Sequence, residues 1–281
     1  MSVEHVWING EVLPIADVQI SPVDHGILIG DGVFETLRTA RGVPFAWSRH
    51  AERLRLSASG LGIDEPDTNA LYQGCLDVMT ANELPEARLR VTVTSGTGPL
   101  GSDRGPGPLT CLIAATPLTG FPPSAAVVVV PWVRNERGAT AGLKTTSYAE
   151  NARALAHAKA QGAAEAIFAN TKDVLCEGTG SNIFWASDGR LHTPALATGC
   201  LAGITRELIL EVAAENGIDI DTGDVAVGDL DSADEAFLTS STRNVQPIDR
   251  VNGRSLHDVP GPLTQRLSTL FDELVERTVN P

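Results

Sequence analysis

The most specific string in the sequence is Glu177-Gly178-Thr179-Gly180-Ser181-Asn182-Ile183-Phe184. Its two glycines let another group approach the backbone closely, because glycine has no side chain. Asn182 follows them at a position where its amide can hold a neighbouring turn. Glu177 ends an apolar strand pattern, so its carboxylate is either a partner for a cationic group or an ordinary surface carboxylate. The string therefore predicts a binding loop centred on Glu177.

One lysine stands out by its position. The chain has only three lysines, Lys144, Lys159 and Lys172. Lys159 falls on a helical pattern and Lys172 in a polar turn, whereas Lys144 follows a strand and loop and precedes a helix. The stretch around it is Gly142-Leu143-Lys144-Thr145-Thr146-Ser147-Tyr148. A lysine amine in a cleft at this point can form a Schiff base with an aldehyde, although a single lysine more often faces solvent.

A third feature is Gly203-Ile204-Thr205-Arg206, where an apolar pattern with helical spacing begins. The first N–H groups of a helix have no partner within it, and the helix dipole favours an anion there. Gly203 leaves these groups accessible, so the backbone of Ile204 and Thr205 is a candidate phosphate site. An ordinary helix start is the alternative.

Together the three features resemble the class IV aminotransferases, which are fold type IV pyridoxal phosphate enzymes, and the resemblance extends over nearly the whole chain. It implies a two-domain α+β fold similar to that of D-amino acid aminotransferase. It also implies an enzyme with pyridoxal 5'-phosphate as its cofactor. Lys144 matches the family's Schiff-base lysine and is the expected catalytic residue. Glu177 matches the glutamate that keeps the pyridine nitrogen protonated.

The resemblance also assigns the other cofactor contacts. Arg53 lies three residues after His50, as in the family, where the arginine contacts the cofactor phosphate through a planar guanidinium that suits a dianion. Two adjacent serines match a further hydroxyl contact. The expected cofactor-binding residues are Arg53, Lys144, Glu177, Ser181, Asn182, Gly203, Ile204, Thr205, Ser240 and Ser241.

Members of this family carry out several reactions. The motif Gly30-Asp31-Gly32-Val33-Phe34-Glu35 is similar to the D-amino acid and lyase branches. We therefore expect transfer of an amino group between a D-amino acid or (R)-amine and a 2-oxo acid. The alternative is 4-amino-4-deoxychorismate lyase, which releases pyruvate and 4-aminobenzoate. A branched-chain L-amino acid aminotransferase is less expected, because that branch typically has a tyrosine-glycine pair where this chain has Ile29-Gly30. A non-catalytic module is a further alternative.

The substrate contacts depart from the family patterns. The residues that typically bind the substrate in D-amino acid enzymes and in the bacterial lyase have no match between Gly96 and Gly105. Arg104 or Arg243 could supply the missing cation. Phe34 and Tyr148 are also candidate substrate contacts. Tyr148 follows the lysine one residue sooner than in the branched-chain enzymes, so a core tyrosine is an equal alternative.

Turn residues and hydrophobic spacing divide the chain into two halves, each with strands and interspersed helices. The proline-rich stretch 117–123 is the expected linker between a small N-terminal α/β domain at 1–116 and a larger cofactor-binding domain at 124–281. Ser48 is expected to cap a helix at 49–59. The other expected helices are 68–81, 147–161, 205–216 and 262–279, and the expected strands are 33–38, 89–94, 109–116, 126–131, 166–170, 174–177, 182–186, 235–238 and 245–248.

Composition and charge argue against several classes of protein. A net charge of −14 without a Lys/Arg cluster argues against nucleic acid binding. No stretch has the roughly 20 apolar residues of a membrane span, and the first residues do not form a secretory signal, so a cytoplasmic location is expected. The cysteines and histidines lack metal-ligand spacing, so no metal is expected. Relatives are homodimers whose small-domain loop reaches the partner's active site, and Gly96–Pro108 matches that loop, so we expect a homodimer.

Overall fold

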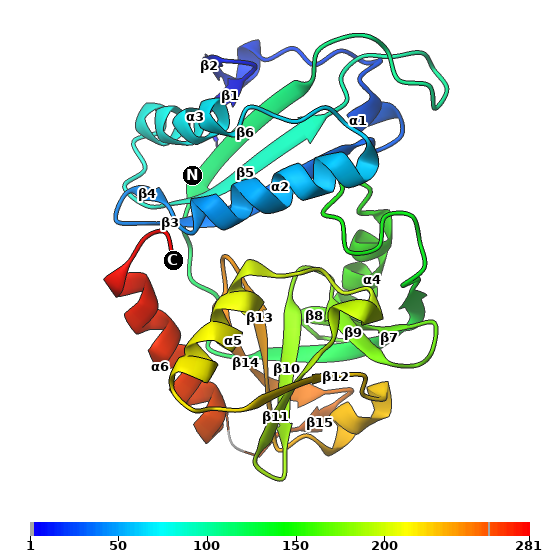
Figure 1. Ribbon diagram of the computed structural model, residues 1–281, viewed down its shortest axis with the longest axis vertical. Helices are drawn as coiled ribbons and strands as arrows, with labels where there is room; N and C mark the ends of the chain where they lie inside the picture. Colours follow the sequence, from blue (N-terminus) through cyan, green and yellow to red (C-terminus); the bar gives the residue numbers. More distant parts are fainter. Residues whose placement is uncertain (1–2, 258) are drawn as a thin grey trace. The chain divides into compact units, whose positions relative to one another are not determined.

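The structure is a computed structural model that describes residues 3–257 and 259–281 (Figure 1). Contacts divide the chain into two compact units. The N-terminal unit comprises Met1–Thr119, Leu143–Tyr148 and Thr278–Pro281, and the C-terminal unit comprises Gly120–Gly142 and Ala149–Arg277. The domains expected at 1–116 and 124–281 are contiguous in sequence, whereas these units are not, because two later segments belong to the first unit.

The N-terminal unit is built on one antiparallel sheet. Its described strands follow the order β2-β1-β6-β5-β3-β4. They are β1 His5–Ile8, β2 Glu11–Pro14, β3 Gly32–Ala40, β4 Val43–Pro44, β5 Ala87–Thr94 and β6 Thr110–Pro117. The turn Asn9-Gly10 joins β1 to β2 with both residues at positive φ (49° and 104°), the backbone that an Asn-Gly hairpin favours.

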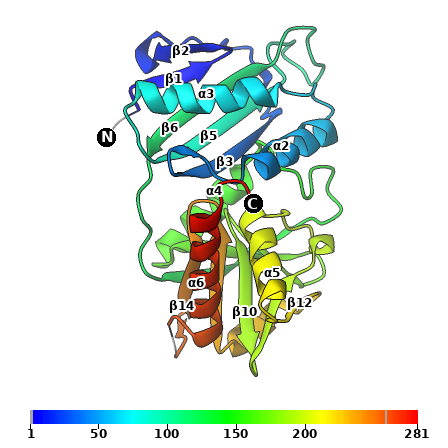
Figure 2. The same ribbon diagram turned by 60° about the vertical axis from the view of Figure 1, so that its left-hand side comes forward.

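Two long helices, α2 Trp47–Leu61 and α3 Thr68–Ala81, pack on this sheet (Figures 1 and 2). The short helices η1 Ile15–Asp17 and α1 His25–Leu28 complete the unit. α3 spans the predicted residues, and Asp67 accepts hydrogen bonds from the N–H groups of its first turn. Side chains of both helices and of the sheet form one apolar core that includes Val33, Leu37, Leu54, Ala58, Leu71, Val78, Leu89, Val91 and Ile113.

The start of α2 corrects the sequence prediction. The residue before the first turn is Ala46 at φ 53°, and its side chain has no atom that could accept a hydrogen bond. Ser48 lies inside the helix, so the prediction that Ser48 is its cap is wrong. An apolar residue in the left-handed region rarely starts a helix, which explains why sequence rules missed this position.

The C-terminal unit is built on a larger, mixed sheet. Its described strands follow the order β12-β11-β10-β13-β14-β7-β8-β9, and β15 pairs with β14. They are β7 Ala125–Arg134, β8 Glu165–Asn170, β9 Leu175–Gly178, β10 Asn182–Ser187, β11 Arg190–Pro194, β12 Ile220–Gly223, β13 Glu235–Ser240, β14 Asn244–Val251 and β15 Arg254–Ser255. β7 is parallel to both of its neighbours, β14 and β8. Its β-branched run therefore lies inside the sheet, as a strand buried on both faces requires.

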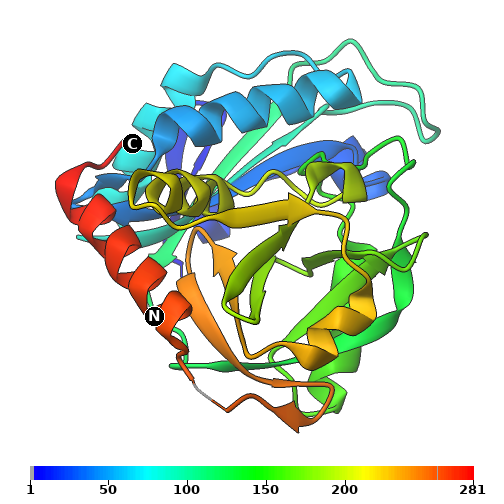
Figure 3. The same cartoon turned by 60° about the horizontal axis from the view of Figure 1, so that its bottom comes forward.

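Helices α4 Ala149–Ala160, α5 Ile204–Glu215 and α6 Pro262–Arg277 and the short helices η2 Leu196–Thr198 and η3 Val227–Ser232 belong to this unit. α5 and α6 lie next to each other (Figure 2), and both also contact β13. η3 lies on the other side of the unit from α6 (Figure 3). The expected α+β class is confirmed, because both units combine sheets with helices. None of the described helices has the length and apolar character that a membrane crossing requires.

Candidate active site

The segment Leu143–Tyr148 is docked on the first residues of β3 in the N-terminal unit. The N–H of Phe34 donates to the carbonyl of Lys144 at 3.0 Å, and the N–H of Thr146 donates to the carbonyl of Gly32 at 2.8 Å. The hydroxyls of Thr146 and Ser147 both donate to the carbonyl of Gly30, at 2.7 and 3.0 Å. The lysine is therefore fixed at the end of a strand by its neighbours' backbone.

The glycines of the Gly30-Asp31-Gly32 motif make this docking possible. A Cβ added at Gly30 would lie 2.7 Å from the hydroxyl oxygen of Ser147, and Gly30 has a φ of 71°. A Cβ at Gly32 would lie 3.1 Å from the hydroxyl oxygen of Thr146 in the lysine segment, and 2.7 Å from the carbonyl oxygen of Val93 in β5. Real side chains do not approach so closely, so this motif is explained by the need to seat the lysine segment.

Helix α2 holds the same segment from another direction. The N–H of Lys144 donates to the hydroxyl of Ser57 at 3.1 Å. The side chain of Leu143 fills the space where Gly60 has no side chain, since a Cβ there would lie 2.7 Å from a Leu143 methyl. Lys144 thus has its amide bound by α2 and its carbonyl bound by β3.

The amine of Lys144 lies among aromatic rings. Its Nζ is 4.4 Å from the centroid of the Phe34 ring and 6.0 Å from that of the Tyr148 ring. The two rings meet edge to face, with centroids 4.9 Å apart. The structure therefore brings together three residues expected at the site, Phe34, Lys144 and Tyr148.

Arg90 of β5 joins this group, although no sequence pattern predicts it. Its guanidinium carbon is 3.3 Å from the centroid of the Phe34 ring. Phe34 is opposite Thr92 in the β3–β5 ladder, so Arg90 is its diagonal neighbour on the same face. Partial withdrawal of the guanidinium from water lowers the pKa of Arg90 to about 10. No carboxylate of the described residues forms an ion pair with Arg90, so its charge is available to an anion.

Arg53 is held by a buried carboxylate. Its Nε and Nη2 donate to the two oxygens of Glu35 at 2.8 and 2.6 Å. His50 Nδ1 donates to Glu35 at 2.7 Å, and Glu35 itself is only 1% exposed. Although burial acts in the opposite direction, the nearby Arg53 and His50 hold the pKa of Glu35 well below its usual range. Burial also lowers the pKa of His50, so His50 is neutral near pH 7.

Arg104, a candidate for binding the substrate carboxylate, forms hydrogen bonds with residues of the N-terminal unit. It donates to both oxygens of Asp31 at 2.7 Å. It also donates to the carbonyls of Gly62 and Leu61 at 2.6 and 2.8 Å. The hydrogen bonds from Arg104 lower the pKa of Asp31. These contacts tie the loop 96–108 to the start of β3 and the end of α2.

Glu177 lies at the end of β9 in the C-terminal unit and is largely buried. Arg134 Nε donates to its Oε1 at 3.2 Å, and the N–H of Leu201 donates to its Oε2 at 3.0 Å. Arg134 also stacks on the ring of Phe168, with its guanidinium carbon 4.2 Å from the centroid. A carboxylate held in this position by a cation and a backbone N–H is oriented to accept a further hydrogen bond, such as one from a protonated ring nitrogen.

Asn182 connects this carboxylate to the start of α5. Its Nδ2 donates to the carbonyl of Leu201 at 2.9 Å, next to the amide that binds Glu177. Its Oδ1 packs against Gly203 so closely that a Cβ there would lie 1.8 Å away. Gly203 is the residue before α5, and no side chain caps that helix. The N–H groups of Ile204 and Thr205 thus lie in the first turn of α5, and the residue before this turn must be glycine.

Three of the other expected residues interact within the same unit. Glu165 binds the N–H of Thr179 at 3.0 Å and the hydroxyl of Ser181 at 3.4 Å, and it also accepts from the Thr179 hydroxyl. Arg243, the second candidate for the substrate carboxylate, pairs with Glu165 at 2.6 Å. Ser240 accepts from the N–H of Arg243 at 3.3 Å, and Ser241 lies in the turn that follows β13. Arg243 is therefore engaged by a buried carboxylate.

These groups fit pyridoxal phosphate, which the sequence resemblance implies. The N-terminal unit offers an amine beside aromatic rings and an oriented arginine, and the C-terminal unit offers a carboxylate held by Arg134 and an uncapped helix start. The bare backbone at Gly203 is the most specific of these features, because Asn182 leaves no space for any side chain there. The cofactor needs an amine, a partner for its ring nitrogen and donors for its phosphate, and each type is present. No group of three or more His, Cys, Asp or Glu side chains in the described part of the chain is placed to hold a metal ion.

Known proteins resemble this chain over almost its full length. The sequence profile of the family described as amino-transferase class IV matches residues 32–251. A Methanocaldococcus jannaschii protein provisionally named branched-chain-amino-acid aminotransferase is 33% identical over 96% of both chains. The aminodeoxychorismate lyase of Bacillus subtilis is 28% identical over 98% of this chain and 96% of its own. The D-alanine aminotransferase of Bacillus licheniformis is 29% identical over 96% of both.

Solved structures agree with this assignment. The branched-chain amino acid aminotransferase of Escherichia coli matches with a TM-score of 0.90 and 26% identity, over 98% of this chain and 95% of its own. The corresponding enzyme of Thermobaculum terrenum, solved in its PLP form, matches with a TM-score of 0.86 and 25% identity, over 97% and 94%. Both matches extend over the two units described above.

Proposed function

This chain belongs to the class IV aminotransferases, and we propose that it transfers an amino group between an amino acid and a 2-oxo acid, with Lys144 as its catalytic residue. It is a pyridoxal-phosphate-dependent enzyme, like the family members of known structure. When bound, the cofactor supplies an aldehyde for a lysine amine and a ring that accepts electrons. The observation that carries the proposal is the placement of the Lys144 amine and the Arg90 guanidinium against the same ring, Phe34.

Lys144 is suited to covalent bonding and proton transfer. Its backbone is bound on both sides, by Ser57 and by Phe34, so the position of the side chain is fixed at its root. Its amine borders the aromatic rings of Phe34 and Tyr148. An amine fixed in this way can bond to an aldehyde with loss of water, and once the amine of the substrate has displaced it, the free lysine amine can carry a proton to or from a substrate carbon.

The cofactor contacts are proposed for each unit. In the N-terminal unit, Arg53 would bind the phosphate while Glu35 fixes its orientation. In the C-terminal unit, Glu177 would pair with the ring nitrogen, and the N–H groups of Ile204 and Thr205 would bind the phosphate. Ser181, Asn182, Gly203, Ser240 and Ser241 complete the proposed cofactor-binding set.

Arg90 supports an amino acid rather than a simple amine as donor. The other arginines considered for this role, Arg104 and Arg243, form ion pairs with Asp31 and Glu165. Arg90 has no such partner among the described carboxylates, and it lies beside the ring that also contacts Lys144. A substrate carboxylate would give Arg90 a charge-assisted partner. An (R)-amine without a carboxylate would not.

We propose a D-amino acid as donor only from the resemblance of the sequence pattern Gly30–Glu35 to the D-amino acid and lyase branches. The relatives named above include branched-chain, D-alanine and lyase enzymes, and both solved structures named above are branched-chain amino acid aminotransferases, so the comparisons support aminotransferase chemistry but do not support a D-amino acid over a branched-chain L-amino acid. The lyase is the second candidate, because its substrate also carries carboxylates that Arg90 could bind and because the Bacillus subtilis lyase matches the chain over 98% of its length.

The assembly that we propose is a homodimer in the cytoplasm. Apolar side chains gather around α1 and the adjoining loop 96–108, with Ile27 60% and Leu100 79% exposed. Val23, Leu28 and Ile29 are exposed near them. Large exposed apolar side chains that cluster in this way are typical of a surface covered by a partner. A second copy of the chain is the partner that we infer.

Product analysis tests the reaction. The purified holoenzyme is incubated with D-alanine, L-leucine or (R)-1-phenylethylamine, each with 2-oxoglutarate, and glutamate is measured. Aminodeoxychorismate is tested alone, with pyruvate and 4-aminobenzoate measured. We expect glutamate from D-alanine in excess of the other donors. Lyase products without any glutamate would establish the second candidate, and glutamate from L-leucine alone would refute the D-amino acid assignment.

A further inference from the structure

The start of α2 is held by residues far away in the sequence. Ala46, the residue before the helix, adopts a left-handed backbone and cannot cap the first turn with its side chain. The segment Thr278–Pro281, which follows α6, belongs to the N-terminal unit and lies at this helix start. It supplies the acceptors that a usual cap residue would provide.

Hydrogen bonds between described residues join the two segments, and they include the following four. The N–H of Ala46 donates to the carbonyl of Val279 at 2.7 Å. The N–H of Ser48 donates to Asn280 Oδ1 at 3.0 Å, and Asn280 Nδ2 donates to the Ser48 hydroxyl at 2.7 Å. Arg49 Nε donates to the carbonyl of Pro281 at 3.0 Å. Asn280 thus fills the place of an N-cap residue, with its carboxamide bound at both ends.

The later turns of α2 carry the residues that hold the proposed site. His50 and Arg53 bind Glu35, and Ser57 binds the amide of Lys144. A helix is stiff along its axis, so a displacement of its first turn moves the groups on the following turns with it. The position of the first turn is therefore coupled to Arg53 and Lys144.

We propose that Asn280 is a positioning residue, which caps α2 from outside the helix and so fixes Arg53 and the Lys144 segment for the cofactor. This inference rests on the proposed roles of Arg53 and Lys144. It goes beyond them because Asn280 acts through α2 and is not proposed to touch cofactor or substrate. Loss of the cap loosens the first turn and lowers the fraction of molecules in which Arg53 and Lys144 are in place.

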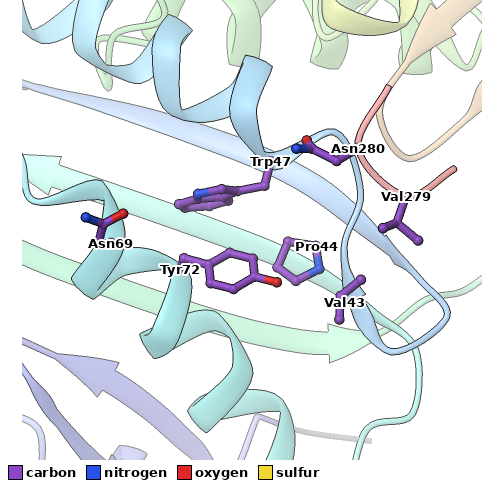
Figure 4. Close-up of a pocket in the computed structure, with 7 residues that line it drawn as sticks. All are labelled: Val43, Pro44, Trp47, Asn69, Tyr72, Val279 and Asn280. Atoms are coloured by element: carbon purple, nitrogen blue, oxygen red, sulfur yellow. The ribbon is translucent and has the colours of Figure 1, made fainter.

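A neighbouring carboxamide offers a matched control. Val279 and Asn280 line a cavity of about 260 Å³ together with Val43, Pro44, Trp47, Asn69 and Tyr72 (Figure 4). Trp47 and Tyr72 face each other there, with ring centroids 5.4 Å apart. Asn69 belongs to α3 and takes no part in the four hydrogen bonds to the start of α2. Asn69→Ala therefore removes an amide from the same cavity without removing the cap.

The test compares Asn280→Ala, Asn280→Asp and Asn69→Ala in the full chain. Amide hydrogen exchange is measured without cofactor on peptides covering 47–50 and 143–148, and pyridoxal phosphate affinity is measured by absorbance titration. For Asn280→Ala we expect exchange in both peptides to rise about 2- to 30-fold, the range set by loss of an N-cap, and cofactor Kd to rise within the same range. Asn280→Asp keeps an acceptor for the Ser48 N–H and adds a favourable charge at the helix start, so it should restore both. Asn69→Ala should match the unaltered chain.

The possible outcomes either support or overturn the proposed role of Asn280. Unchanged exchange at 143–148 in Asn280→Ala would overturn the coupling, and so would faster exchange with an unchanged cofactor Kd. If Asn69→Ala raised amide exchange and cofactor Kd as much as Asn280→Ala does, the effect would be explained by damage to the cavity. The same would hold if Asn280→Asp did not restore both quantities. The exchange measured without cofactor separates this inference from the proposed function. If Lys144 is not the cofactor lysine, the exchange pattern is still expected and the cofactor result alone fails.

Discussion

The carboxylate of Glu35 and the guanidinium of Arg53 form a two-bond ion pair in which Nε and Nη2 of the arginine are both used, at 2.8 and 2.6 Å. A bidentate pair fixes the plane of the guanidinium as well as its position. The buried carboxylate therefore orients the cation from the protein side. Any anion that Arg53 binds meets a preset donor instead of a mobile side chain.

Replacing Arg53 by alanine should weaken cofactor binding. Loss of one charge-assisted contact to a phosphate typically costs roughly 1.5–3 kcal/mol, which corresponds to about one to two decades in Kd. Because Glu35 would lose its main partner, the double variant Arg53→Ala with Glu35→Gln is the control for an unpaired buried charge. Dialysis and reconstitution with pyridoxal phosphate measure the affinity. Unaltered affinity in both variants would exclude a phosphate contact by Arg53.

The buried pair of His50 and Glu35 should make the stability of the folded chain depend on pH. His50 and Glu35 both have pKa values below their usual ranges in the folded chain. As the pH falls, the unfolded chain protonates His50 below about 6.5 and Glu35 below about 4.5, before the folded chain does. Because the unfolded chain then binds more protons, the stability of the folded chain falls on acidification. His50→Gln keeps a donor for Glu35 but removes the upper titration. We expect its thermal midpoint to fall less between pH 7 and pH 5 than that of the unaltered chain, and equal slopes would contradict the neutral, buried state of His50.

Glu177→Gln should reduce turnover more than cofactor affinity. The amide cannot hold a ring nitrogen protonated, while the phosphate donors at Ile204 and Thr205 are unchanged. The expected loss in kcat is about 10²-fold or more, as is typical when a key electrostatic partner is removed. Arg134→Gln is a useful comparison, because it leaves the Glu177 carboxylate in place but removes its cation. A Glu177→Gln variant with near-normal kcat would show that this carboxylate has no part in the reaction.

Arg90→Gln should raise KM for an amino acid donor with little change in cofactor affinity. Loss of a charge-assisted contact to the carboxylate corresponds to about a 10- to 100-fold effect on kcat/KM. Donors without a carboxylate provide the internal control, because their kcat/KM should be unaffected. Arg104→Gln is the matched variant, since Arg104 is bound to Asp31 and is expected to act on the loop 96–108. If Arg104→Gln changed KM and Arg90→Gln did not, Arg90 would not be the residue that binds the substrate carboxylate, and Arg104 would take its place.

Local patterns predicted much of the fold. α3 covers the predicted residues because Asp67 caps it and its apolar spacing is regular. The strands β3, β5, β6 and β10 lie where alternation or β-branched runs indicated them. β11 and β12 were missed, because Leu191 to Pro194 and Ile220 to Gly223 mix polar residues, proline and glycine, and only pairing with neighbours makes them strands.

The candidate site was predicted unevenly, and the reason is sequence separation. Lys144 and Glu177 stand in recognisable strings, and so do the glycines that allow close packing. The partners that hold them do not. Arg134 reaches Glu177 from β7, and Asn280 reaches the start of α2 from beyond α6. Arg90 looks like a solvated strand arginine until the fold places it diagonal to Phe34.

The most direct test of the central claim is to identify which lysine bonds to the cofactor. The holoenzyme is reduced with borohydride, digested, and the labelled peptide is mapped by mass spectrometry. With only three lysines in the chain, the assignment is unambiguous. We expect the label on Lys144, and we expect Lys144→Ala to abolish both the label and turnover while the thermal midpoint changes little. A label on Lys159 or Lys172, or a Lys144→Ala variant that keeps its turnover, would contradict it.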